Sequence, residues 1–132
     1  MTLTPEGVII NREVVLNRGR NGEAGARTDI WIDALIKETS EKLSLCIEVK
    51  GSWNRSAPTA MKEQLVDKYM GNGGADVGIL LVGWFQSHKV PQKNMWEDNR
   101  DMARAELEQQ AAKLTQSGYL IKSIVIDCEY RL

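Results

Sequence analysis

The feature that most constrains the fold is an unbroken apolar run from Val77 to Trp84, which holds only Val, Gly, Ile, Leu and Trp. A strand with one face in water alternates apolar and polar residues, so an unbroken run of this length is typical of a strand covered on both faces. Such strands belong to parallel sheets, in which a helix connects one strand to the next. The chain is therefore predicted to be an α/β protein.

Three further strands are predicted before this run. Apolar residues alternate from Val8 to Leu16, and two more apolar segments follow at Asp29–Leu35 and Leu43–Val49. The links between them are polar, and the first link, residues 17–27, is rich in glycine. Polar links of this kind join antiparallel neighbours, so the three strands are expected to form a meander.

Two helices and a last strand complete the predicted order. The first helix begins with Ser56 as its cap and Pro58 in its first turn, and its buried stripe is formed by Met61, Leu65 and Tyr69. A second helix over Asp98–Gln116 is expected to bury Ala103, Leu107, Ala111 and Leu114. The last strand covers Ile121–Cys128. The predicted order is βββαβαβ, a mixed sheet of about five strands with flanking helices.

Composition limits the classes of partner. The chain has 132 residues and a net charge of −1, so a nucleic-acid partner would need a local basic patch rather than a basic protein. Cys46 and Cys128 lie in apolar strand patterns and are interpreted as buried free thiols of a cytoplasmic protein. No apolar run approaches the length of a membrane span, so no membrane partner is expected.

Charged residues gather where two of the predicted strands are neighbours. Glu48 and Lys50 are two residues apart, so they share one face of their strand. Asp29 lies on the preceding strand and is expected to meet them at cross-strand distance. Two carboxylates beside one ammonium suit a hard cation and favour metal-assisted hydrolysis of a phosphodiester. The alternative is an exposed Glu–Lys pair at a strand end. Because that sheet face is not core, replacing either residue is expected to leave the fold intact.

These three residues resemble the signature of the PD-(D/E)XK nucleases, which belong to the restriction-endonuclease-like superfamily. Asp29 matches the first acid, Glu48 the second, and Lys50 the lysine. The similarity covers roughly residues 8–85, including the helix after the motif. The resemblance implies a restriction-endonuclease-like core and a Mg²⁺ cofactor, with Mn²⁺ as a substitute. Asp29, Glu48 and the backbone carbonyl of Val49 would hold the metal, while Lys50 would assist the attacking water.

Three departures from the family pattern are visible. Thr28 stands where the family usually has proline, and Gln64 and Tyr69 are five residues apart where some relatives have the pair four apart. Family members usually have a helix before the first strand, whereas only Met1 to Gly7 precedes it here. We therefore expect residues 1–132 to be one nuclease-like domain cut from a larger protein.

Secondary candidates surround this motif. Glu13 lies on the first strand, where it either adds an acid to the metal or is solvated. Gln64 lies one helical turn before Lys68, and the two are expected to share a face that touches phosphate or a water on the metal. Asp33 shares the face of Asp29 and is interpreted as solvated. The glycine-rich link brings three arginines that either reach phosphates or decorate a solvated hairpin: Arg18, Arg20 and Arg27.

The four tryptophans divide into two groups. Trp31 and Trp84 lie in predicted strands and are expected to fill the core. Trp53 and Trp96 lie in predicted loops, where they either stack on bases or cover a sheet end.

The sequence thus predicts a Mg²⁺-dependent phosphodiesterase, a deoxyribonuclease and more specifically an endonuclease, whose partner is DNA. Two alternatives stay open: a module that has lost cleavage and serves in DNA binding or assembly, and a nuclease that acts on RNA. A homodimer and additional domains are both compatible with the sequence.

Overall fold

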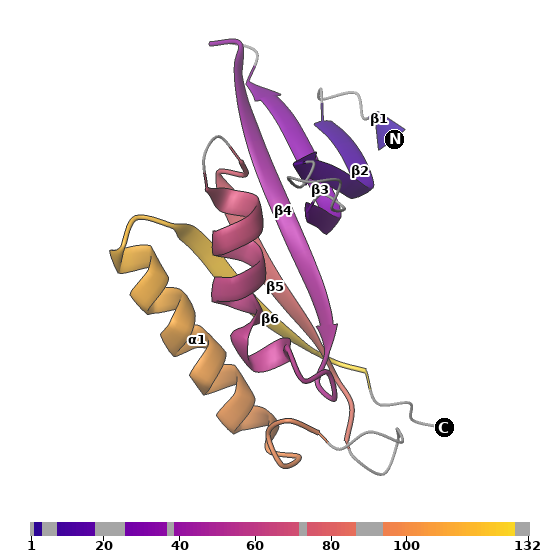
Figure 1. The fold of residues 1–132 in the computed structure, drawn as a ribbon, viewed down its shortest axis with the longest axis vertical. Coiled ribbons are helices and arrows are strands. Elements are labelled where there is room, and N and C mark those ends of the chain that lie inside the picture. The colour runs from indigo at the N-terminus through magenta and orange to yellow at the C-terminus, as the bar shows by residue number, and fades with distance from the viewer. Residues whose placement is uncertain are drawn as a thin grey trace.

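The computed structural model describes residues 2–3, 8–17, 26–36, 39–71, 74–86 and 94–128, with side chains from Ile30 onward except Ile36. Within these residues six strands form one mixed sheet in the order β1-β2-β3-β4-β5-β6 (Figure 1). The strands are β1 (Thr2–Leu3), β2 (Val8–Asn17), β3 (Ala26–Ile36), β4 (Glu41–Gly51), β5 (Val77–Trp84) and β6 (Leu120–Asp127). The helices are η2 (Ala57–Thr59), η3 (Met61–Met70) and α1 (Arg100–Gln116).

The sheet changes from antiparallel to parallel at β4. Strands β1 to β4 pair antiparallel with their neighbours, whereas β4 pairs parallel with β5, and β5 parallel with β6. The predicted meander and the two helical crossovers are therefore confirmed, as is the α/β class with a mixed sheet. The two-residue strand β1 precedes the elements that the sequence predicted.

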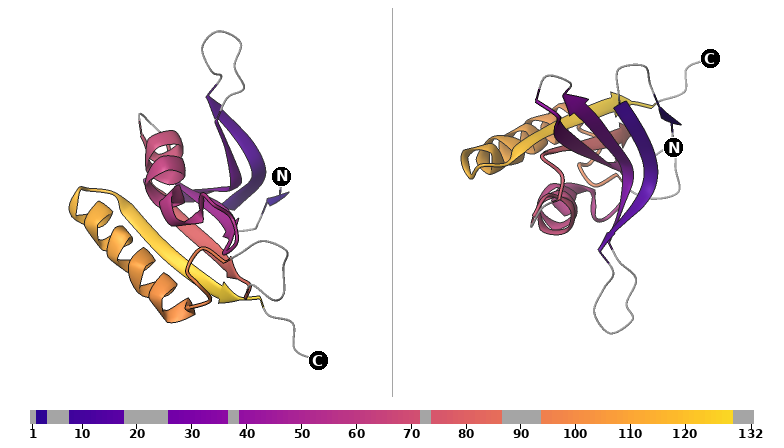
Figure 2. Two further views of the ribbon diagram at one scale, coloured as in Figure 1. Left: turned by 60° about the horizontal axis from the view of Figure 1, so that its bottom comes forward. Right: turned by 90° about the horizontal axis from the view of Figure 1, so that it is seen from above.

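Both long helices cover the same face of the sheet. A Cβ atom built on Gly78 of β5 would meet Met70 and Leu65 of η3, so Gly78 faces that helix. The Cα partner of Gly78 on β6 is Ile121, which is buried in the same core as Leu107 of α1. Two successive crossovers of the same hand, proceeding in the same direction across a sheet, place their helices on one side. The antiparallel strands bend around the side on which η3 lies (Figure 2).

The prediction that Val77–Trp84 is covered on both faces is wrong. Its residues alternate, since Gly78, Leu80 and Val82 are buried while Ile79 and Leu81 are only partly buried. Within the described residues the helices flank one side of the sheet only. The opposite side carries exposed apolar side chains from two strands: Leu43, Val49, Leu120, Ile124 and Ile126. The less covered side chains of the run, Ile79 and Leu81, lie on the face that carries these apolar side chains of β4 and β6, so both faces of the run are apolar.

The first helix departs from its predicted form in two ways. It starts as the 3-10 turn η2 and continues as η3, a π-helix with i→i+5 hydrogen bonds. Ser56 makes no side-chain cap hydrogen bond, because its backbone is already helical, with φ −86° and ψ −6°, and its hydroxyl donates to Asn54 Oδ1 at 2.7 Å. The predicted stripe is confirmed, and the wider π-helical turn adds two more buried residues to Met61, Leu65 and Tyr69, namely Val66 and Met70.

The second helix begins two residues later than predicted. Glu97 and Asp98 have φ angles of 54° and 61°, so the backbone is left-handed there and cannot belong to the helix. Asn99 caps α1 by accepting a hydrogen bond from the Met102 amide at 2.9 Å. Ala103, Leu107 and Ala111 are buried as predicted, while Leu114 is partly buried against the core.

Aromatic residues close the core at the carboxyl ends of the parallel strands. Trp31 and Trp84 are buried as predicted. Trp96 is also buried, with its ring centroid 6.4 Å from that of Trp84, so it covers the sheet end and cannot stack on a base. Trp53 lies against Gly51 and is partly exposed.

The two cysteines differ in exposure. Cys46 is a buried free thiol, whereas the prediction of burial is wrong for Cys128, which is free and exposed because β6 ends one residue before it. No helix in the described part of the chain is both long and apolar enough to span a bilayer.

Candidate functional site

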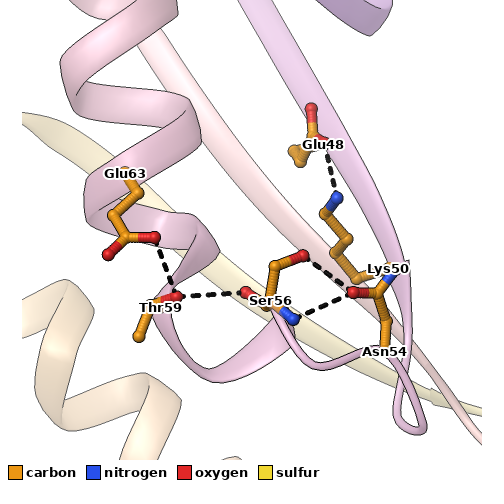
Figure 3. Close-up of polar contacts among 6 residues, drawn as sticks. All are labelled: Glu48, Lys50, Asn54, Ser56, Thr59 and Glu63. Carbon is orange, nitrogen blue, oxygen red and sulfur yellow. Dashed lines mark hydrogen bonds and ion pairs between the residues drawn. The ribbon is translucent and has the colours of Figure 1, made fainter.

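Glu48 and Lys50 project from β4 on the helix-covered face of the sheet. Their Cα partners on β5 are Leu80 and Val82, both fully buried, while Val49 between them is 42% exposed on the opposite face. Lys50 Nζ lies 3.4 Å from Glu48 Oε1, and their side chains are only 16% and 7% exposed (Figure 3). The alternation along a strand thus places the two side chains together, as the sequence predicted. The alternative of an exposed pair is wrong.

Asp29 lies on the neighbouring strand at the matching height. Ile30 of β3 and Ile47 of β4 are Cα partners in the antiparallel register. Asp29 immediately precedes Ile30, and Glu48 immediately follows Ile47, so their backbone positions are adjacent across the two strands. The side chain of Asp29 lies outside the described part of the structure. The backbone therefore brings the first predicted acid beside the second.

A buried polar network fixes the end of β4 just beyond Lys50. Ser52 is fully buried, and its amide donates to Gly83 O at 2.9 Å. Its hydroxyl donates to Phe85 O at 2.9 Å and accepts from the Phe85 amide at 2.8 Å and from Asn94 Nδ2 at 2.9 Å. One donor and two acceptor positions are all that a hydroxyl has, so Ser52 is fully satisfied. The network ties β4 to the end of β5 and to the segment that leads into α1.

Residues 51–57 form a compact turn next to Lys50, which we call the 51–57 turn (Figure 3). The Asn54 amide donates to Gly51 O at 2.9 Å, and the Ala57 amide donates to Asn54 O at 3.0 Å. Asn54 Oδ1 also accepts from the Ser56 amide at 2.9 Å, which is the Asx-turn pattern. Sequence reasoning identified neither this turn nor the Ser52 network. The only local signal was the Asn–x–Ser spacing.

The pKa of the neighbouring thiol excludes cysteine chemistry at this site. Burial, and to a smaller extent the negative charge of Glu48 two residues along the same strand face, together raise the pKa of Cys46 to about 12. A thiolate is the form of cysteine that attacks electrophiles and binds metals. Cys46 is therefore a neutral, inert core residue at physiological pH.

The π-helix η3 carries the next candidates, Gln64 and Lys68, together with Tyr69. Gln64 is partly buried and Tyr69 is buried, both on η3. In a helix with i→i+5 hydrogen bonds, residues four and five positions apart both lie close to one turn apart, so Lys68 and Tyr69 are both about one turn from Gln64. Lys68 is exposed on the same helix, four residues after Gln64, in keeping with the one-turn relation predicted for the two.

The remaining predicted residues fall into two groups. Asp33 is not simply solvated, because it accepts from Trp31 Nε1 at 2.9 Å and from Ser44 Oγ at 2.6 Å. It is a structural link between β3 and β4. The backbones of Glu13 and Arg27 lie in β2 and β3, but their side chains lie outside the described set, and Arg18 and Arg20 lie outside the described residues altogether.

The donor set fits a hard cation. Among the side chains that the structure describes, no three His, Cys, Asp or Glu residues gather to hold a metal, and Asp29 is not among those side chains. Mg²⁺ needs only one or two carboxylates, because water and substrate phosphate fill its other positions. Glu48 and Asp29 carboxylates with the Val49 carbonyl are all oxygen donors, as Mg²⁺ prefers. The neighbouring Lys50 ammonium balances the Glu48 charge.

No protein-family model matches the chain, and searches of the curated proteins and of the solved structures found no match either. Glu48 and Lys50 form a largely buried carboxylate–ammonium pair at the carboxyl end of a parallel strand, the edge at which open α/β sheets bind ligands. Such a pair offers an oxygen ligand and a proton donor within one small volume.

Proposed function

We propose that this chain is a Mg²⁺-dependent nuclease that hydrolyses DNA phosphodiester bonds on a PD-(D/E)XK, restriction-endonuclease-like core. The observation that carries the proposal is the 3.4 Å approach of Lys50 Nζ to Glu48 Oε1 beside the backbone of Asp29. The βββαβαβ order of the main elements is compatible with that core.

Stability alone does not account for this pair. Removing two charges from water costs about as much as their attraction returns, so a buried ion pair is a weak stabiliser compared with apolar residues of the same volume. Leu80 and Val82, the strand partners of Glu48 and Lys50, show that apolar side chains fit this layer of the core. A charged pair held there is better explained by chemistry.

The roles of the residues follow from their groups. Glu48, Asp29 and the Val49 carbonyl would hold Mg²⁺ or Mn²⁺, which when bound supplies a Lewis acid that offsets charge on the phosphate and lowers the pKa of water. Lys50 donates hydrogen bonds to the attacking water or to a phosphate oxygen, and its charge stabilises the transition state. The water oxygen bonds to phosphorus as one ester bond breaks. The departing oxygen takes up a proton as the water loses one, leaving a phosphate monoester and a hydroxyl.

Cleavage of circular substrates tests the proposal. Circular double-stranded and single-stranded DNA have no ends, so their cleavage in Mg²⁺ or Mn²⁺ identifies an endonuclease. We expect no cleavage in EDTA, and a rate at least about 100-fold lower for Lys50→Met or Glu48→Gln, the scale on which a transition-state donor acts. Gel electrophoresis of the products measures both.

The same strand supplies a matched control. Lys42 of β4 lies 3.6 Å from Asp33 Oδ1, an ion pair that is far more exposed than the first. Lys42→Met should therefore cleave like the wild type, once rates are expressed per folded molecule. Wild-type cleavage in EDTA, or full activity in Lys50→Met, would contradict the proposal. Binding of DNA without cleavage would favour the binding module, and cleavage of RNA alone would favour the ribonuclease.

A further inference from the structure

The 51–57 turn, which begins one residue after Lys50, presents an exposed arginine, Arg55. Arg55 is the second residue of the turn closed by the Ala57 amide and Asn54 O. The first turn brings the Cα of Asn54 within about 7 Å of that of Gly51, and Arg55 is one residue further on, so its Cα lies on the order of 10 Å from the end of β4. Asn54, the residue before Arg55, is held at the end of β4, because its amide donates to Gly51 O at 2.9 Å.

The backbone that carries Arg55 is fixed on both sides. Before it, Ser52 is held by its buried hydrogen bonds to the end of β5. After it, Asn54 Oδ1 accepts from both the amide and the hydroxyl of Ser56, at 2.9 and 2.7 Å. A turn that is already ordered loses little backbone entropy when a ligand binds to it.

The charge of Arg55 is available to a ligand. Five other cations lie within 4 Å of a carboxylate: Lys42, Lys50, Lys62, Arg100 and Arg104. Arg55 makes no ion pair with any side chain that the structure describes, and it is exposed. A planar guanidinium with five donors matches the oxygens of a phosphate, which it binds in a bidentate manner.

We propose that Arg55 binds a backbone phosphate of the nucleic acid, adjacent to the phosphate that is hydrolysed beside Lys50. This inference rests on the proposed function and adds a substrate contact to the same site. The contact is independent of base identity, because phosphates are common to every sequence. It would give this chain, whose net charge is −1, a local cationic contact with the substrate backbone near the site of hydrolysis.

Salt-dependent binding tests the inference. The wild type, Arg55→Gln and Arg104→Gln are titrated against a fluorescein-labelled 20-base-pair duplex in EDTA, at several salt concentrations, by fluorescence anisotropy. Each phosphate contact contributes about 0.9 to the slope of log affinity against log salt. Arg55→Gln should flatten the slope by about that amount. Arg104→Gln should leave it unchanged, since Arg104 is an exposed α1 residue already 3.7 Å from Asp101.

The possible outcomes separate this inference from the proposed function. A slope for Arg55→Gln equal to that of the wild type overturns the phosphate contact, even if the wild type cleaves DNA. An Arg55-dependent slope in a protein that never cleaves supports the contact and overturns the hydrolysis. A wild type that does not bind the duplex in EDTA overturns the phosphate contact, and cleavage in Mg²⁺ then decides the proposed function separately. Because Arg55 is exposed, circular dichroism of the variant should match that of the wild type.

Discussion

At the scale of single residues, β4 carries two lysine–carboxylate pairs whose surroundings differ. In the pair of Lys42 and Asp33 the lysine side chain is 62% exposed, so the pair is expected to contribute only about 0–1 kcal/mol. In the pair of Lys50 and Glu48 both side chains are largely buried, and removing one partner leaves a charge in the core. The expectation that Lys50 can be replaced without effect on the fold therefore has to be corrected. Activity of its variants must be compared per folded molecule.

The first prediction concerns pH. The pKa of Cys46 rises from an ordinary 9.0 to about 12 on folding, first through burial and then through the charge of Glu48. Between these values the unfolded chain has lost the thiol proton while the folded chain keeps it, so stability falls as pH rises above 9. The slope from this thiol is at most about 1.4 kcal/mol per pH unit. Urea unfolding at pH 8.5, 9.5 and 10.5 should show a shallower decline for Cys46→Ser.

Cys128 provides the control for this measurement. It is exposed, so Cys128→Ser should keep the wild-type dependence on pH. An identical decline in wild type and Cys46→Ser would show that the buried thiol does not set the alkaline stability. In the native protein, a thiol reagent should modify Cys128 quickly and Cys46 only on unfolding.

At the scale of elements, local patterns predicted where strands lie but not what covers them. Val77–Trp84 is the whole of β5, because an apolar β-branched run has few alternatives to a strand. The second face of β5 would be covered only if the two crossover helices lay on opposite sides of the sheet. No local sequence pattern predicts on which side each helix lies. Ser56 illustrates the same limit. Serine is common at helix caps, but the Ser56 backbone is already helical and its hydroxyl and amide both donate to Asn54 Oδ1.

The second prediction compares the two faces of the sheet. Leu80 on β5 is fully buried under the helices, whereas Leu43 on β4 is 44% exposed on the opposite face. Leu80→Ala should lower the free energy of unfolding by about 2–5 kcal/mol, because it leaves a cavity under η3. Leu43→Ala should lower it by less than about 1 kcal/mol. The urea midpoints, at an unchanged m-value, give both numbers.

Equal losses in the two variants would contradict the one-sided core. The comparison is matched, since both substitutions remove the same atoms from a strand of the same sheet. A large loss for Leu43→Ala would mean that the open face is covered in solution.

At the scale of the whole molecule, the sequence predicts those parts of the candidate site that lie on one strand or on two paired strands. Glu48 and Lys50 came from one alternating pattern, and Asp29 from the strand paired with it. The Ser52 network could not be predicted, because its hydrogen bonds join residues 33 and 42 positions apart. Nor could the π-helix be predicted, since its hydrogen-bond spacing differs from that of an α-helix by only one residue.

The last prediction tests the metal without any substrate. A cation that binds only the folded state stabilises it by mass action, by about 2.7 kcal/mol at 100 times its dissociation constant. Wild-type protein should therefore melt at a higher temperature in millimolar Mn²⁺, and Glu48→Gln should not, because the amide is a poorer ligand than the carboxylate. Glu63→Gln serves as the control, since Glu63 is an exposed acid on η3 that bonds to Thr59. It should respond to Mn²⁺ as the wild type does. Equal shifts in the wild type and Glu48→Gln would mean that the ion binds elsewhere, and the Glu48–Lys50 pair would then be a structural feature of the core rather than a centre of catalysis.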